Sequence, residues 1–287
     1  MDKSKVYFIR EVSSDAALKV LSATGKTLEG KIAVKLHSGE VGNQNFIRPD
    51  FVKPIIDSVN GTIVECNTAY EGARNTTDKH IETMKKHGWS DIAPVDILDG
   101  AGDKKLTVEN GKIIKENYVG ANIDNYDSML VFSHFKGHPM GGFGGALKNI
   151  SIGLASSYGK AYIHGAGEVE KIWSAEHNKF LASMADAAKS VVDYFDGKMV
   201  FVNVMCNMSV DCDCCAIAED PAIADIGCLA SLDPVALDKA CLDLVYRSED
   251  PGKAHLIERI ESRNGIYTVE CAEKLGIGST DYELIEL

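Results

Sequence analysis

The sequence lacks the features that mark nucleic-acid-binding and membrane proteins. Its 287 residues include 30 Lys and Arg against 42 Asp and Glu, so the formal net charge is −12, and no long block of basic residues occurs. Because binding to nucleic acid depends on clustered positive charge, we expect no nucleic-acid partner. The apolar runs are far shorter than the roughly 20 residues that span a bilayer, so we expect no membrane association.

The amino-terminal segment also lacks the apolar stretch and small-residue cleavage site of a secretory signal. We therefore expect a cytoplasmic location, where thiols stay reduced. In that compartment the eight cysteines favour metal binding or thiol chemistry over disulfides.

Alternating strand and helix patterns predict the fold class. Short apolar runs at 31–36, 61–66, 128–134 and 198–204 are typical of buried strands, and apolar residues at helical spacing follow several of them. We predict an α/β protein with mostly parallel sheets flanked by helices. Residues 1–287 form a single domain in this interpretation, with a division into two lobes around a crevice that 134–164 lines.

Further elements are expected on local signals. Asn110-Gly111 lies between alternating runs and predicts a hairpin, and Asp233-Pro234 predicts the start of a helix. Helices are also expected near 48–59, 76–87 and 175–196, and a second short strand at 160–164.

No phosphate loop ending in Gly-Lys-Ser/Thr and no dinucleotide fingerprint is present, yet the segment 134–164 is rich in glycine. It leaves the end of a predicted strand, which is where open α/β sheets bind ligands. His134 and His138 are candidates for proton transfer, because imidazole titrates near neutral pH. The alternative is a tight connection with solvated histidines.

The second half of this segment suits an anion. The bare amides of Gly144 and Gly145 could receive negative charge, and Lys148 could add a positive charge or act as an amine nucleophile. Lys35, Arg48 and Arg74 follow or flank the first predicted strands, so we also expect them at the crevice, where they would neutralise a small anionic ligand. The competing interpretation is surface loops.

Four cysteines gather within ten residues in "CNMSVDCDCC". These are Cys206, Cys212, Cys214 and Cys215, and thiolates this close favour a soft metal or an iron–sulfur cluster. Their spacing matches neither a zinc ribbon nor the ferredoxin run. Redox thiols, which would imply a redox partner, and buried cysteines without chemistry stay open as alternatives, whereas Cys66, Cys228, Cys241 and Cys271 are expected in the core.

Several motifs taken together resemble a known family. "IAVKLHSGE", "IRPDFVKP", "NTAYEGARNTTDKH", "HFKGHPMGGFGGALKNISIG", "CDCC" and "DIGCLASLDPVALDKACLDLV" are similar, in this order, to the uncharacterised iron–sulfur centre proteins of domain-of-unknown-function family 362. Many members carry an inserted ferredoxin-like module with two four-cysteine runs. This chain has no such run, so only "CDCC" supports an iron–sulfur cluster.

A more distant resemblance links "HPMGGFGGALK" to the nickel-pincer lactate racemases. It implies His138 as a catalytic histidine, Lys148 as the tether of a nickel-pincer nucleotide, and His164 as a nickel ligand, and "IRP" with Arg48 resembles a substrate-binding arginine–proline. The sequence departs from that family at "GGALKN", where Gly-Gly-Arg-Lys is usual, and it has no Thr-Gly-Thr-His motif.

Three functional hypotheses follow. The first is a cytoplasmic metal- or iron–sulfur-binding protein, an enzyme that acts on a small anionic substrate. The second is a nickel-dependent 2-hydroxy-acid racemase or epimerase, and the third is a non-catalytic carrier of a metal or cluster.

Overall fold

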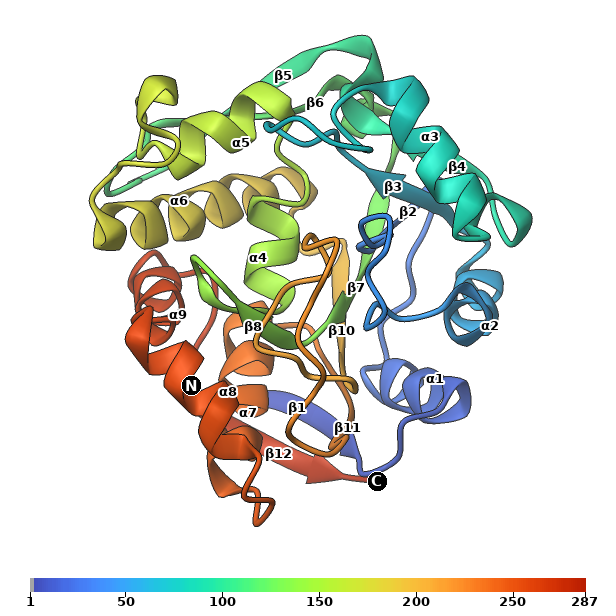
Figure 1. Ribbon diagram of the computed structural model, residues 1–287. Helices are drawn as coiled ribbons and strands as arrows, with labels where there is room; N and C mark the ends of the chain where they lie inside the picture. The colour runs from blue at the N-terminus through green and yellow to red at the C-terminus, as the bar shows by residue number, and fades with distance from the viewer. Residues whose placement is uncertain (1–2) are drawn as a thin grey trace.

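An eight-stranded sheet forms the centre of the molecule in the computed structural model, which describes residues 3–287 (Figure 1). The strand order is β12-β1-β11-β10-β7-β2-β3-β4. The strands are β1 (Ser4–Ile9), β2 (Ile32–Lys35), β3 (Thr62–Glu65), β4 (Val95–Ile97), β7 (Ser128–His134), β10 (Met199–Met205), β11 (Gly227–Ser231) and β12 (Tyr282–Glu286). Two small antiparallel pairs lie outside it, β5 (Asp103–Thr107) with β6 (Glu116–Gly120) and β8 (Lys136–His138) with β9 (Gly142–Gly144).

Most neighbouring strands of the sheet are parallel. β10, β7, β2, β3 and β4 run in one direction and β1 is parallel to β12, whereas β11 pairs antiparallel with both β1 and β10. The parallel half places the carboxyl ends of β7, β2 and β3 at one edge. The predicted α/β class with a mostly parallel sheet is confirmed.

Helices cover both faces of this sheet. Side chains alternate along β7, with Met129 and Val131 packed in one apolar cluster and Leu130 and Phe132 in another. The first cluster lies against α4 (Ala146–Ser151), α6 (His177–Phe195), α7 (Pro234–Arg247), α8 (Lys253–Ser262) and α9 (Ile266–Lys274). The second lies against α1 (Ser14–Ala23), α2 (Pro49–Val59) and α3 (Thr77–Lys86), while α5 (Ser157–His164) packs beside α6.

Local sequence signals located most elements correctly. The hairpin at Asn110 is present as β5 and β6, with Asn110 at a φ of 58° that suits a turn. Asp233 caps α7, because its carboxylate accepts hydrogen bonds from the amides of Val235 and Ala236. Cys66, Cys228, Cys241 and Cys271 are buried, as expected of core cysteines.

One predicted element is wrong. Residues 160–164 were expected to form a strand, but they belong to α5. Ser156 begins this helix by accepting a hydrogen bond from the amide of Gly159, and the pattern Ser-Ser-Tyr-Gly before "KAYIH" is therefore a helix start.

No helix within residues 3–287 has the length and apolar character needed to cross a membrane. The division into two lobes stays a prediction.

Candidate functional site

A cavity of about 270 Å³ opens at the carboxyl ends of three parallel strands. Ser133 and His134 end β7, Glu65 ends β3, and His37 follows β2; all four line the cavity. Residues from the glycine-rich segment, among them Gly144 and Gly145, complete the wall. The structure thus brings the two loops after the first strands and the segment 134–164 together, at the edge where parallel sheets bind ligands.

Basic side chains gather at the cavity of an otherwise acidic protein. Four of them line it, Arg74, Lys136, Lys148 and Lys160, whereas Glu65 is the one carboxylate of the lining among the described residues; Glu40 and Asp213 pair with Arg74 and Lys136. The whole chain carries a formal net charge of −12. The concentration of cations in this one concave site favours a small anion as the ligand.

Arg74 keeps an unused donor in this region. Its Nε donates to Glu40 at 3.1 Å, but its Nη2 is buried and has no hydrogen-bond partner among the described residues. An unsatisfied buried donor costs about 1–3 kcal/mol. A ligand oxygen would satisfy it, since a guanidinium pairs well with carboxylate or phosphate.

Lys35 lies beneath the cavity and is neutralised by a carboxylate. Its ammonium is fully buried, donates to the carbonyl of Leu36, and lies 3.2 Å from a carboxylate oxygen of Glu65. Burial disfavours the charged form of Glu65, but Lys35 and the nearby His37 outweigh it and hold the pKa of Glu65 below its usual range. Lys35 therefore supports the site instead of offering a free charge.

His134 belongs to a buried charge cluster. Its Nδ1 donates to Asp213 at 2.9 Å and its Nε2 donates to the carbonyl of Cys206 at 2.6 Å, while Lys136 lies 3.0 Å from the other oxygen of Asp213. Both partners of the ring offer acceptor oxygens, so neither ring nitrogen presents a free lone pair to the cavity. His134 would have to break one of these bonds before it could accept a proton.

His138 has the opposite arrangement at Nδ1. This nitrogen accepts hydrogen bonds from the amides of Gly141 at 2.8 Å and Met140 at 3.2 Å. Burial lowers the pKa of His138 to about 4, with Lys148 as a further cause, so the ring is neutral at neutral pH. The proton of the neutral ring is then on Nε2, so this nitrogen is a hydrogen-bond donor, and His138 would have to change its tautomer before it could accept a proton there.

His164 has the tautomer that metal ligands adopt. Its Nδ1 donates to the carbonyl of Lys160 at 2.8 Å, its ring stacks on Phe180, and burial lowers its pKa to about 4. The lone pair on Nε2 is therefore free. A histidine that donates its other N–H to a backbone carbonyl is the usual form of a ligating histidine.

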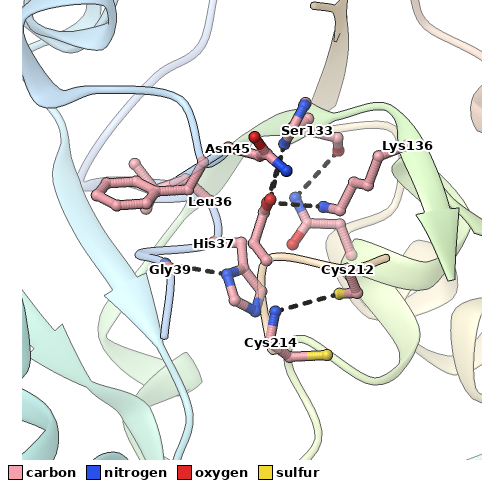
Figure 2. A network of polar contacts seen from close by, with 12 residues as sticks. Leu36, His37, Gly39, Asn45, Ser133, Lys136, Cys212 and Cys214 are labelled. Atoms are coloured by element: carbon pink, nitrogen blue, oxygen red, sulfur yellow. Dashed lines mark hydrogen bonds and ion pairs between the residues drawn. The ribbon is translucent and has the colours of Figure 1, made fainter. Parts of the chain in front are cut away.

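Two cysteines approach the same point as His138. The ligating atoms of His138, Cys212 and Cys214 all lie within 4.8 Å of one another. In Figure 2 the Cys214 amide donates to the Cys212 sulfur, and Lys136 extends toward the same network. Cys214 raises the pKa of Cys212 to about 11 through a hydrogen bond, with burial adding to the shift. Thiols of this kind lose their protons when a metal binds.

The structure does not gather every predicted site residue. Cys206, Cys215 and His164 lie outside the three-donor group. Arg48 is exposed and stacks on Phe46 at 4.0 Å, and it does not line the cavity. Lys148 does line it, and no hydrogen bond or ion pair within residues 3–287 engages its ammonium. The functional roles predicted for these residues stay predictions.

Lys148 is positioned by a contact that the sequence did not reveal. It lies in the first turn of α4, and the buried carboxylate of Asp238 accepts hydrogen bonds from the amides of Ala146 at 2.8 Å and Leu147 at 2.9 Å. A Cβ at Gly145 would lie 2.3 Å from Asp238, so glycine permits this close approach. The glycine run thus serves helix placement as well as the cavity wall.

Sequence reasoning missed two basic residues. Lys136 and Lys160 line the cavity, although neither stood out from the sequence. Lys136 lies two residues after His134 on the same segment, and its partner Asp213 lies in "CDCC". The signal available in the sequence was the spacing of histidine, lysine and acidic residues within the segment 134–164 and within "CDCC".

One family model matches most of the chain. The model of the family described as "Domain of unknown function (DUF362)" matches residues 32–243. A search of the curated proteins found no match.

Two solved structures are similar to this chain. The lactate racemase apoprotein from Thermoanaerobacterium thermosaccharolyticum has 14% identity and a TM-score of 0.47, over 98% of this chain and 82% of that one. A structural genomics target from Thermotoga maritima has 9% identity and a TM-score of 0.45, over 91% of this chain and 58% of that one.

Proposed function

Because this chain belongs to the DUF362 family, whose description names no activity, we propose from the site itself that it is a metal-binding enzyme acting on a small anion. The observation that carries the proposal is the convergence of His138, Cys212 and Cys214 at the wall of the cationic cavity. Two thiolates and one imidazole suit a soft or borderline ion such as zinc or iron.

Three protein donors leave a coordination position for a substrate or water. This is the pattern of catalytic metal sites, whereas structural sites use four protein ligands. His138 and Cys214 line the cavity, so an ion held there would face the bound anion. The ion would act as a Lewis acid, and Arg74 and Lys148 would hold the charge of the substrate.

Coordination of a metal ion by His138 requires that this ring give up its proton. The amides of Met140 and Gly141 already use the lone pair on Nδ1, so the ion would have to replace the proton on Nε2. An iron–sulfur cluster would need further ligands, for which Cys215 and Cys206 are the neighbouring thiols.

A second candidate is a nickel-pincer nucleotide enzyme that racemises or epimerises a 2-hydroxy acid. The tautomer of His164 favours it, because its Nε2 offers a free lone pair to a metal ion. Lys148 has an ammonium without a partner among residues 3–287, which suits a covalent tether. These two residues fit such a group, which when bound would accept and return hydride.

Metal analysis separates the candidates. The protein is purified without oxygen, metals and sulfide are quantified, and absorption spectra are recorded. The first proposal expects zinc or iron that is lost in Cys212→Ser/Cys214→Ser and retained in His164→Ala. The second proposal expects nickel that is retained in Cys212→Ser/Cys214→Ser and lost in His164→Ala. It also expects an added mass on Lys148.

Cys271→Ser is the matched control, because Cys271 is buried outside the cavity. Intact iron and sulfide in a catalytically silent protein would favour the carrier hypothesis. Absence of any bound metal after reconstitution with zinc, iron and nickel would refute both metal proposals.

A further inference from the structure

Lys160 differs from the other buried lysines of the cavity in its partners. It is 8% exposed and lines the cavity, yet no carboxylate lies within 4.0 Å of its Nζ among residues 3–287. Lys35 and Lys136, by contrast, are paired with Glu65 at 3.2 Å and Asp213 at 3.0 Å. A buried ammonium without a counter-ion is costly, so this lysine needs another explanation.

The hydrogen bonds of Lys160 fit an uncharged amine. Its Nζ donates to the carbonyl of Ala155 at 2.6 Å and to that of Cys66 at 3.4 Å. A neutral amine has two N–H groups and one lone pair, so two carbonyl acceptors satisfy both hydrogens and leave the lone pair free. Burial lowers the pKa of Lys160, which agrees with this count.

The backbone holds the amine in this place. The Ser156 hydroxyl caps α5 at its start, and a Cβ at Gly159 would lie 1.9 Å from the carbonyl of Tyr118. Only glycine permits this close approach of α5 to β6. The first turn of α5 is therefore fixed beside the end of β3, where Cys66 supplies one of the two carbonyls.

We propose that Lys160 is a nucleophilic amine that forms an imine with a small carbonyl compound carrying an anionic group. The proposal rests on the proposed function in one respect, that the cavity binds small anions. The lone pair on Nζ attacks the carbonyl carbon and a C–N bond forms. The carbonyl oxygen takes up protons from the amine and solvent and leaves as water.

The resulting iminium keeps one hydrogen on nitrogen, which can still donate to the carbonyl of Ala155. The free Nη2 of Arg74 on the same cavity is available for the anionic group of the ligand. The site therefore offers both an amine for the carbonyl carbon and a cation for the negative charge.

Reductive trapping tests this assignment on the intact protein. Glyoxylate, which has an aldehyde and a carboxylate, is added with cyanoborohydride, and modified lysines are located by peptide mass spectrometry. We expect one carboxymethyl group on Lys160 before the exposed lysines react, and loss of this label in Lys160→Met. Lys53→Met is the control, because Lys53 is exposed and outside the cavity, and this variant should keep the label on Lys160.

The outcomes distinguish this inference from the proposed function. Label on Lys148 or only on surface lysines would overturn the role of Lys160. Glyoxylate binding by calorimetry without imine trapping would also overturn it, while the anion site would stand. Absence of both binding and trapping would refute the two together. Because the label is located on the wild-type chain, the test does not depend on whether the variant folds.

Discussion

Several residues of the cavity keep hydrogen-bonding capacity that no described residue uses. The Nη2 of Arg74 has no partner, the Nε2 of His164 has a free lone pair, and Lys148 is unpaired among the described residues. Buried polar groups in proteins are nearly always satisfied. Other buried atoms, such as the Nε2 of His80, also lack a partner among the described residues, but three such groups at one cavity favour a ligand there.

Substitution of Arg74 tests the anion site at the scale of one residue. Arg74→Lys keeps a cation for Glu40 but removes the second guanidinium nitrogen. We expect about tenfold weaker binding of acetate, equivalent to about 1.4 kcal/mol, measured by calorimetry. Arg48→Lys is the control, since Arg48 is outside the cavity, and equal weakening in both variants would contradict the assignment.

Contacts between elements place the chemical groups of the cavity. The short helix α4 carries Lys148, and its first amides are held by Asp238 from α7, a partner 90 residues further along the chain. Asn203 of β10 donates to the same carboxylate at 2.8 Å. A helix of six residues has little stability of its own, so this buried contact fixes its start.

Asp238 should make stability depend on pH. Burial raises its pKa to about 6 from 3.8, so the folded protein binds this proton more tightly than the unfolded chain. The contribution is complete below about pH 4 and is lost as the pH rises through 6. This loss amounts to about 3 kcal/mol in the free energy of unfolding.

Denaturant unfolding of wild type and Asp238→Asn across this range measures the effect. The difference in the free energy of unfolding between the two proteins should change between pH 4 and 6 and stay constant above pH 7. An unchanged difference across the whole range would show that folding does not raise the pKa of Asp238. Asp233→Asn is the control, because this capping residue is only partly buried.

At the scale of the whole molecule, the cavity depends on two distant parts of the chain. The long connection 206–226, orange in Figure 1, returns from β10 toward β8. The amide of Gly137 donates to the carbonyl of Ser209 at 2.7 Å. Closure of this connection over the sheet brings Cys212 and Cys214 to His138, so metal binding should stabilise the complete fold.

Thermal unfolding with and without zinc tests this coupling. At a zinc concentration about 100 times the dissociation constant, we expect about 2.7 kcal/mol of stabilisation and a melting temperature raised by roughly 5 to 10 °C. Cys212→Ser/Cys214→Ser should show no shift, whereas Cys271→Ser should respond as wild type does. An equal shift in the double variant would place zinc elsewhere.

Local sequence patterns were sufficient to predict most helices and strands and the edge of the sheet at which the site lies. Apolar runs such as Ser128–His134 form strands and the Asp233-Pro234 pair starts a helix, because neighbouring residues decide these features. The carboxyl ends of parallel strands share one edge, so the loops after β2, β3 and β7 could be assigned to one crevice in advance. The expected strand at 160–164 failed because the helix cap at Ser156 outweighs a short apolar run.

Tertiary structure decided which charges are free and which donors meet. No sequence pattern shows that Asp213 pairs with His134 and Lys136, or that Lys160 has only carbonyl partners among the described residues. These contacts join residues that are close only after folding, and burial then changes proton affinities according to the partners present. The cysteines and histidines were visible as motifs, but three-dimensional packing brought His138 to Cys212 and Cys214 and left Cys206, Cys215 and His164 outside that group.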